Sequence, residues 1–243
     1  GIADLNGDTH PDFLVSGWGE LGLFESDPQG TVWTRTAAAR GLEPANGDQS
    51  WVGWAVEFAD LDHDGKEEGL VAYGHWEFFD PEDNPDTPNP DQQPDALFAF
   101  DGAVASDQAN AWGFADDTPG RAMALADLNL DGHVDVIRRP VYSPATIDSP
   151  PCSDSGSVTI SLQQSGPNPH GIGATVSITT DELQQTRWIR AGGTGLASGG
   201  PPGVHFGLGD ADQVDQLTIT WPDGAQASWT DVPRDHHIQA IRE

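Results

Sequence analysis

Apolar residues occur along the chain in short runs, many of them alternating with polar residues, and turns rich in Gly, Pro, Asp and Asn separate the runs. A period of two positions bounded by such turns is typical of β-strands, whereas an amphipathic helix repeats every three to four positions. In the first half of the chain the predicted strands flank three acidic segments and cover residues 13–16, 51–59, 70–73, 120–126 and 134–137. In the last third they cover residues 158–162, 174–179, 186–190, 214–221, 225–232 and 237–241. The sequence therefore predicts an all-β fold.

The three acidic segments are copies of one pattern and align without gaps. Residues 4–12 read D-L-N-G-D-T-H-P-D, residues 60–68 read D-L-D-H-D-G-K-E-E, and residues 127–135 read D-L-N-L-D-G-H-V-D. Their first residues are 56 and 67 positions apart (60 − 4 and 127 − 60). Repeats of about this length indicate an array of supersecondary units such as propeller blades. Each acidic segment is expected to be a loop between two strands.

The polar residues of each segment stand where a tight loop places oxygen ligands around one cation. Calcium accepts six to eight oxygen ligands, and side chains at positions 1, 3, 5 and 9 with the carbonyl of position 7 supply several of them. The predicted side-chain ligands are Asp4, Asn6, Asp8 and Asp12 in the first loop, Asp60, Asp62, Asp64 and Glu68 in the second, and Asp127, Asn129, Asp131 and Asp135 in the third. The predicted carbonyl ligands belong to His10, Lys66 and His133. We therefore predict up to three Ca²⁺ sites, with magnesium or another hard cation as the alternative.

The spacing distinguishes these loops from EF-hands. An EF-hand requires a bidentate Glu at position 12, and here that position holds Val15, Val71 and Arg138. Gly65 and Gly132 stand at position 6, where the chain turns sharply and positive φ favours glycine, but Thr9 stands there in the first loop. The first loop is thus the least typical of the three.

The charge is strongly acidic and unevenly distributed. The chain has 39 Asp and Glu against 10 Lys and Arg, a formal charge of −29. Residues 1–156 carry 30 of the acids and 6 of the bases. This balance argues against nucleic acids and anionic membranes as partners, and no apolar run is long enough for membrane insertion. The single cysteine, Cys152, excludes an internal disulfide.

Composition also suggests the domain boundaries. Residues 143–156 are rich in Pro and Ser and are predicted to be a linker between the repeats (1–142) and a small antiparallel β-sandwich or barrel-like domain (157–243). Residues 80–95 hold five prolines and six acids, which predicts an exposed insertion. Only three residues precede the first loop, so we expect the chain to begin inside a repeat.

Several motifs resemble known families. The acidic loops between strands resemble the FG-GAP (VCBS-type) repeats of integrin alpha-subunit propellers and of many bacterial secreted proteins. Four motifs after the predicted linker, G-I-G-A at 171–174, G-G-T-G at 192–195, H-F-G-L-G at 205–209 and W-P-D-G at 221–224, resemble the ASPIC/UnbV domain of cartilage acidic protein and its bacterial relatives. The resemblance implies a partial β-propeller in a secreted, cell-surface or periplasmic calcium-binding protein with an adhesion, surface-assembly or scaffolding role. It implies no catalytic activity.

A partial propeller needs a partner. About two and a half repeats cannot close a ring that ordinarily has four to eight blades. We therefore expect another protein, or an N-terminal part of the same chain, to complete the propeller, and we expect the chain to be stable only in that larger unit. Cell-surface glycans are a further candidate partner.

Two other functions remain open: a carbohydrate-binding module, and an accessory subunit of a polysaccharide-active or biosynthetic enzyme. Aromatic faces can stack on sugars, but the tryptophans of the repeat half are expected mainly in blade cores; they are Trp18, Trp33, Trp51, Trp54, Trp76 and Trp112. The eight histidines are dispersed except for His236 and His237, whose side chains would diverge on a strand. Residues 17–22 match G-x-G-x-x-G, but no helix follows, so a turn is predicted there. The chain contains none of the G-x-x-x-x-G-K-[ST], H-E-x-x-H or G-x-S-x-G motifs, and we expect it not to be an enzyme.

Overall fold

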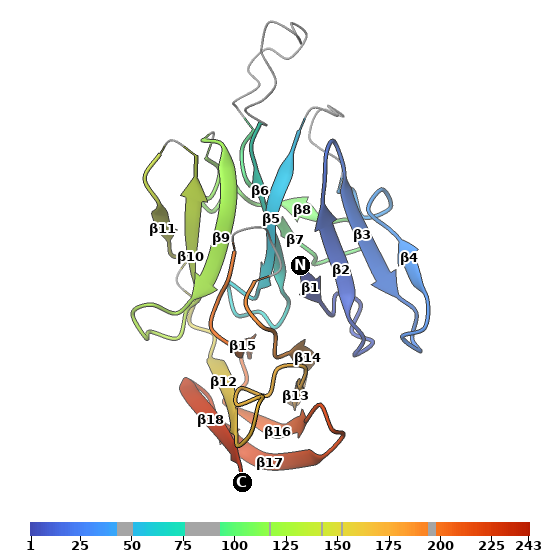
Figure 1. Ribbon diagram of the computed structural model, residues 1–243, viewed down its shortest axis with the longest axis vertical. Coiled ribbons are helices and arrows are strands. Elements are labelled where there is room, and N and C mark those ends of the chain that lie inside the picture. The colour runs from blue at the N-terminus through green and yellow to red at the C-terminus, as the bar shows by residue number, and fades with distance from the viewer. Residues whose placement is uncertain (43–50, 76–92, 117, 142, 152, 194–197) are drawn as a thin grey trace, which may run out of the picture.

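The computed structural model describes residues 1–42, 51–75, 93–116, 118–141, 143–151, 153–193 and 198–243. These residues form eighteen strands in five sheets and no helix (Figure 1), which confirms the predicted all-β class. In this part of the chain no sheet closes into a barrel, and no helix that could span a membrane is found.

The first three sheets are antiparallel meanders, as expected for propeller blades. Blade 1 contains β1 (Ile2–Ala3), β2 (Asp12–Ser16), β3 (Leu21–Ser26) and β4 (Trp33–Arg35); blade 2 contains β5 (Gly53–Ala59), β6 (Glu68–Tyr73), β7 (Ala96–Ala99) and β8 (Ser106–Asp107); blade 3 contains β9 (Gly120–Ala126), β10 (Asp135–Pro140) and β11 (Thr146–Asp148). β11 lies inside the range predicted as a linker, 143–156, and pairs with β10, so blade 3 extends into that range.

The blades pack face to face because alternate residues of a strand point to opposite sides of its sheet. In β6, Val71 and Tyr73 join one buried cluster with Leu14 and Leu23 of blade 1. Leu70, on the opposite face of β6, joins a second cluster with Met123 and Val136 of blade 3. Every residue of β6 is therefore buried, and blade 2 forms the centre of the repeat half.

The C-terminal domain is a two-sheet sandwich below the blades in Figure 1. One sheet has the order β15 (Gly203–Gly207), β12 (Ser157–Gln164), β18 (His236–Arg242), and the other has the order β14 (Gln184–Trp188), β13 (Thr175–Thr179), β16 (Gln213–Thr220), β17 (Gln226–Pro233). Their inner faces share one apolar core that includes Ile160, Ile178 and Phe206. Two features differ from the predicted antiparallel domain: β12 and β18 pair in parallel, and β15 was not predicted as a strand because it follows a glycine-rich segment and is itself bounded by glycines.

Two predictions about burial need correction. Trp18 and Trp33 were expected mainly in blade cores, but they are 54% and 39% exposed. Trp51, Trp54 and Trp112 do pack against the blade cores, and Trp76 lies outside the described residues. The predicted insertion at 80–95 also lies mostly outside them, but its end was wrongly expected to be exposed, since Gln93 and Asp95 are buried. Both make hydrogen bonds to blade 2, Gln93 with the amide of Val52 and Asp95 with that of Tyr73.

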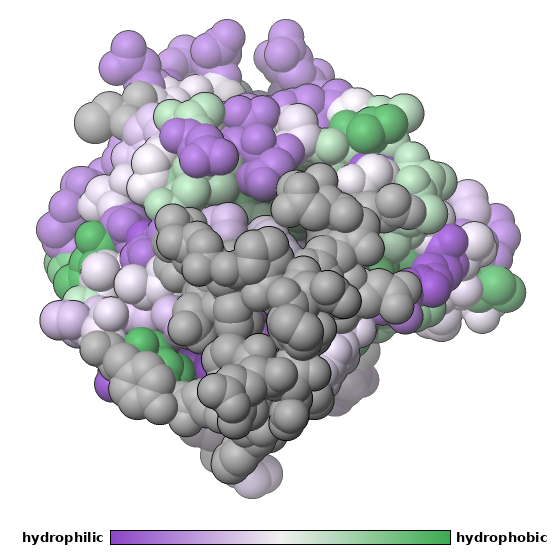
Figure 2. Space-filling view, turned by 90° about the horizontal axis from the view of Figure 1, so that it is seen from above, coloured by the Kyte–Doolittle hydropathy of each residue, from purple (hydrophilic) through white to green (hydrophobic). Residues whose placement is uncertain are grey.

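Figure 2 looks onto the end of the molecule that is opposite the C-terminal domain. Hydrophilic residues cover much of the described surface there, and the most hydrophobic residues appear as separate spots. This distribution agrees with the acidic composition of the repeat half.

Candidate metal centre

The three acidic loops share one backbone conformation. Each connects the first two strands of its blade, and the residue before position 1 pairs with position 9 in the same register: Ala3 with Asp12, Ala59 with Glu68, and Ala126 with Asp135. Positive φ recurs at positions 4 and 6, at 73° and 69° for Gly7 and Thr9, 63° and 94° for His63 and Gly65, and 61° and 91° for Leu130 and Gly132. The loops therefore lie between strands, as predicted, and Thr9 adopts the conformation that glycine takes in the other two.

Hydrogen bonds inside the loops repeat in the same way. The carboxylate at position 9 accepts the N–H of the leucine at position 2, as Asp12 does from Leu5, Glu68 from Leu61 and Asp135 from Leu128, at 2.8, 2.8 and 3.0 Å. The carboxylate at position 1 accepts the N–H of position 6, as Asp4 does from Thr9, Asp60 from Gly65 and Asp127 from Gly132, each at 2.9 Å. The carboxylates are thus fixed by the backbone that surrounds them.

Thr9→Gly is expected to stabilise the protein. A β-branched residue at φ 69° carries about 1–2 kcal/mol of strain, and glycine removes this strain. Glycine also raises the conformational entropy of the unfolded chain, which offsets part of the gain in stability. We expect a net gain of up to about 1 kcal/mol in the free energy of unfolding, measured by chemical denaturation. Gly65→Ala is the matched control: it should destabilise, because φ is 94° and a Cβ would meet Leu183 Cδ1. A loss of stability in Thr9→Gly would contradict the strain argument.

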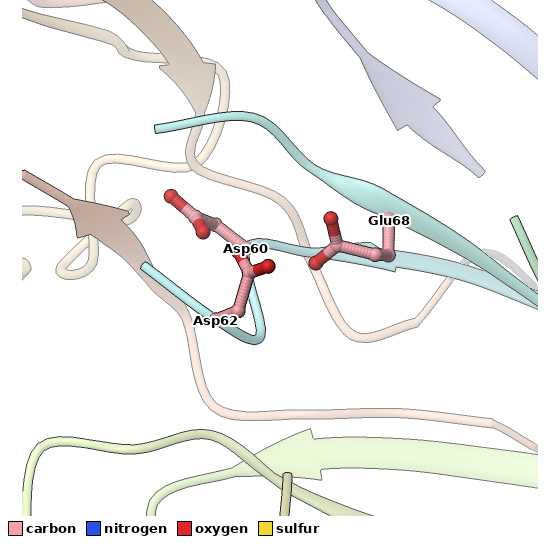
Figure 3. Close-up of side chains that lie close together, drawn as sticks. All are labelled: Asp60, Asp62 and Glu68. Carbon is pink, nitrogen blue, oxygen red and sulfur yellow. The ribbon is translucent and has the colours of Figure 1, made fainter. Parts of the chain in front are cut away.

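The second loop brings three predicted ligands together. One oxygen each from Asp60, Asp62 and Glu68 lie within 4.8 Å of one another, with the two aspartates on the loop and Glu68 on the strand beside it (Figure 3). The fourth predicted side chain, Asp64, instead accepts the backbone N–H of Lys66 at 2.8 Å and lies 3.4 Å from its Nζ. An acidic cluster of this kind is consistent with a hard cation such as Ca²⁺.

Burial makes this cluster costly without a cation. It raises the pKa of Asp60 to about 7, against the attraction of Arg187 and with repulsion from Asp64. Burial likewise raises the pKa of Glu68 to about 9, with further repulsion from Asp60 and Asp62. Oδ1 of Asp60 is buried and has no hydrogen-bond partner. A divalent cation would remove the repulsion between the carboxylates and would provide the unpaired oxygen of Asp60 with a partner.

The first and third loops differ from the second at position 9. In each, a serine hydroxyl from the same blade donates to the position 9 carboxylate: Ser26 to Asp12 at 3.0 Å and Ser149 to Asp135 at 2.6 Å. Ser26 also donates to Asp8, and the Asn129 amide donates to Asp131. Among the described residues, no three His, Cys or carboxylate donors other than the Asp60 group come within 4.8 Å. Ligation in these two loops, and by the carbonyls of His10, Lys66 and His133, stays a prediction.

One contact that the sequence did not reveal connects the second loop to the C-terminal domain. The backbone N–H of Gly207 donates to Asp60 Oδ2 at 3.0 Å, and a Cβ at Gly207 would collide with that oxygen and with the backbone of His63. Gly207 belongs to the H-F-G-L-G motif, so the motif was visible in the sequence but its partner was not. The C-terminal domain therefore supports the candidate metal centre directly.

A cavity of about 160 Å³ lies beside this contact, between blades 2 and 3 and the C-terminal domain. Its buried glutamates face arginines of the C-terminal domain: Glu67 lies 3.2 Å from Arg187, and Glu57 lies 3.9 Å from Arg190. The cavity is smaller than the roughly 300–1,000 Å³ of ordinary ligand pockets. It can hold a few water molecules or a very small ligand.

The fold and the loops define an all-β repeat protein with acidic, metal-site-like hairpins. Residues 4–71 match the family model described as FG-GAP-like repeat, and residues 164–243 match the one described as ASPIC and UnbV. No curated protein matches the chain. The chain thus contains FG-GAP-like repeat sequence followed by an ASPIC/UnbV domain, which confirms the suspected architecture. FG-GAP repeats are typical of extracellular or surface proteins.

Proposed function

We propose that the protein is a calcium-binding adhesion, surface-assembly or scaffolding protein that acts outside the cell, at its surface or in the periplasm, with calcium stabilising its blades. The convergence of Asp60, Asp62 and Glu68 carries this proposal. Asp60 directly follows β5 and Glu68 begins β6, so an ion bound by both would fasten the two strands at their shared end. The Gly207 contact would extend this effect to the C-terminal domain.

Calcium should stabilise the protein more as the pH rises from about 5 to about 9. Burial raises the pKa values of Asp60 and Glu68 to about 7 and about 9, so in the absence of calcium the folded chain holds protons on these carboxylates that the unfolded chain does not. The free energy of unfolding therefore falls as the pH rises and these protons are lost. Bound calcium keeps both carboxylates ionised and removes that loss. The measurement is the difference in Tm with and without calcium at several pH values. Asp181→Asn, a change at an exposed carboxylate, should leave the profile unchanged, and a pH-independent difference would contradict the assignment to this cluster.

The surface role can be tested on producing cells. If calcium holds the scaffold in its functional shape, washing intact cells with a calcium chelator should release the protein, and washing with a magnesium-selective chelator should release much less. Protein found only in the cytoplasmic fraction would overturn the proposed localisation.

We also propose that further blades, from another protein or from another part of the same chain, complete the propeller. Three blades do not close a ring of the usual four to eight. On β2 of blade 1, Leu14 faces the core whereas its neighbour Val15 is 50% exposed, so the face of blade 1 turned away from blade 2 presents apolar surface. Sedimentation of the purified chain should show self-association or partial unfolding. A monodisperse, folded monomer would contradict this proposal.

The described residues do not favour the two alternative functions. Trp18 lies two residues after the end of β2, whereas Trp33 donates its ring N–H to the carbonyl oxygen of Pro11, just before the start of β2. These exposed tryptophans therefore lie near opposite ends of the strand and do not form a row for a sugar chain. The cavity next to the metal centre pairs its buried glutamates with arginines rather than presenting them to a substrate. Neither observation supports a carbohydrate-binding module or an enzyme accessory site.

A further inference from the structure

Each blade has a forward face toward the next blade in the sequence and a backward face toward the preceding one. The forward face contains position 11, counted from the start of the loop, and its cross-strand partner; these are Leu14 with Leu23 in blade 1, Leu70 with Leu97 in blade 2 and Ile137 with Ile147 in blade 3. In blades 1 and 2 these side chains are buried against the next blade. In blade 3, Ile147 is 62% exposed and Ile137 is half-buried. Among the described residues, no blade covers the forward face of blade 3.

The leucine at position 2 of each loop shows the same difference. Leu61 of the second loop is buried in one apolar cluster with Val136 of blade 3, and Leu5 of the first loop packs against the cluster that blades 1 and 2 share. Leu128 of the third loop is 52% exposed. The contact with a following blade that buries this leucine in the first two loops is missing in the third, so Leu128 extends the apolar surface of the forward face.

Blade 1 presents the opposite half of such a contact. The backward face contains position 12 and the residue two places before position 1; these are Val71 and Phe58 in blade 2, and Val15 and Ile2 in blade 1. The blade 2 pair is buried against blade 1, whereas Val15 is 50% exposed and Ile2 is half-buried. Ile2 pairs with Phe13, and Phe13 pairs with Phe24. A row of apolar side chains therefore crosses this face.

The backward face of blade 1 continues onto the C-terminal domain. A groove of about 490 Å³ lies between them, with Ile2 and Phe13 on the blade side and Ile172 and Trp188 on the domain side. Its volume is within the range of sites that receive a bound molecule, roughly 300–1,000 Å³. Phe13 stands at position 10, the position that Leu61 of the preceding blade meets in blade 3. Leu128 of a blade seated here would by the same pairing point toward the groove.

We propose that two copies of the chain associate head to tail, with the forward face of blade 3 in each copy seated on the backward face of blade 1 in the other. The two faces are the halves of a contact that the chain already makes twice, on either side of blade 2 (Figure 1). Three blades from each copy make six, within the usual four to eight, and two such contacts related by a twofold axis close the ring. This inference rests on the proposed completion of the propeller and names a second copy as the partner that completes it.

The charge of the chain sets the conditions for this association. Each copy has a formal charge of −29, so repulsion opposes association at low ionic strength and salt screens that repulsion. Leu128 belongs to the third acidic loop, so a cation bound there would also reduce the repulsion where the copies meet. Because apolar contacts hold the two faces together, the dimer should become stronger from low to physiological ionic strength.

The test is sedimentation equilibrium of the full chain in calcium and about 0.15 M salt, where we expect twice the mass of one chain. Ile147→Asp and Val15→Asp should each weaken the dimer at least about tenfold, because each places an unpaired carboxylate in an apolar contact. Both side chains are exposed in the single chain, so both variants should fold, and their Tm in calcium verifies this. Ile241→Asp, at an isoleucine of β18 that is 64% exposed and outside both faces, is the matched control and should dimerise as the unmodified chain does.

The two variants together distinguish a head-to-tail contact from other contacts. Weakening in only one of them would show that like faces meet and would overturn the proposal, as would a dimer that persists in both or a species larger than a dimer. A monomer would also overturn it. A partly unfolded monomer would leave completion by other blades in place, whereas a folded monomer that binds calcium would reject any completion and keep the calcium role, so the failures are distinguishable.

Discussion

Calcium at one hundred times its Kd is expected to raise the free energy of unfolding by about 2.7 kcal/mol for each loop that it occupies. Three occupied loops would contribute about 8 kcal/mol, which is comparable to the whole stability of many domains. The physical reason is that each loop gathers carboxylates whose mutual repulsion the ion removes, and the unfolded chain offers no such arrangement. Chemical unfolding at fixed free calcium, with magnesium as the comparison ion, measures the effect.

Variants of the second loop separate its share from the others. Asp60→Asn and Glu68→Gln should each remove the increase in the free energy of unfolding that calcium gives through one loop. Asp181→Asn should leave the whole increase in place. Without calcium, Glu68→Gln should be at least as stable as the unmodified chain, because burial raises the pKa of Glu68 to about 9 and makes its ionised form unfavourable. Equal calcium stabilisation in all three variants would contradict a site at Asp60 and Glu68.

Arg138→Ala is expected to cost about 3–5 kcal/mol, the usual loss when one member of a buried ion pair is removed. The Arg138 side chain is 7% exposed and lies 3.2 Å from Asp95 Oδ2, and Asp95 is 4% exposed. It also donates to Asp148 at 2.8 and 2.9 Å and to the carbonyl of Phe114 at 2.8 Å. Asp95 precedes β7 and Asp148 ends β11, so one guanidinium joins blades 2 and 3. Urea unfolding measures the loss.

Two comparisons make this result specific. Arg35→Ala breaks a pair with Glu20 whose side chains are 52% and 67% exposed, and such pairs contribute at most about 1 kcal/mol. Arg138→Met combined with Asp95→Asn should recover part of the loss, because the double change removes the unpaired buried carboxylate while an amide oxygen can still accept the N–H of Tyr73. A loss below about 1 kcal/mol in Arg138→Ala would show that the pair does not hold the blades together.

The local features of this fold were predictable from the sequence. The period of two positions predicts the strands around each acidic loop. The gapless alignment of the loops predicts that they share one geometry, including the sharp turn with positive φ at position 6. Thr9 shows the limit of residue preference, because it adopts positive φ where the pattern favoured glycine. The hydrogen bonds of its loop evidently outweigh the preference of a β-branched side chain.

The features that the sequence did not predict depend on contacts between distant segments. Gly207 donates to Asp60 from 147 positions away in the sequence, so no local spacing identifies this contact. Arg138 was recognisable only as a residue unsuited to an EF-hand, and its ion pairs appear once blade 2 lies beside blade 3. The same holds for Trp18 and Trp33, since hydrophobicity alone does not say which face of a blade is covered.

The most direct test of the account is a count of bound calcium by equilibrium dialysis of the purified chain at neutral pH. The account predicts up to three ions per chain, one of which is lost in Asp60→Asn and retained in Asp181→Asn. A chain that binds no calcium at millimolar concentration, or that binds it equally well after Asp60→Asn, would contradict the central claim that the acidic hairpins are calcium sites.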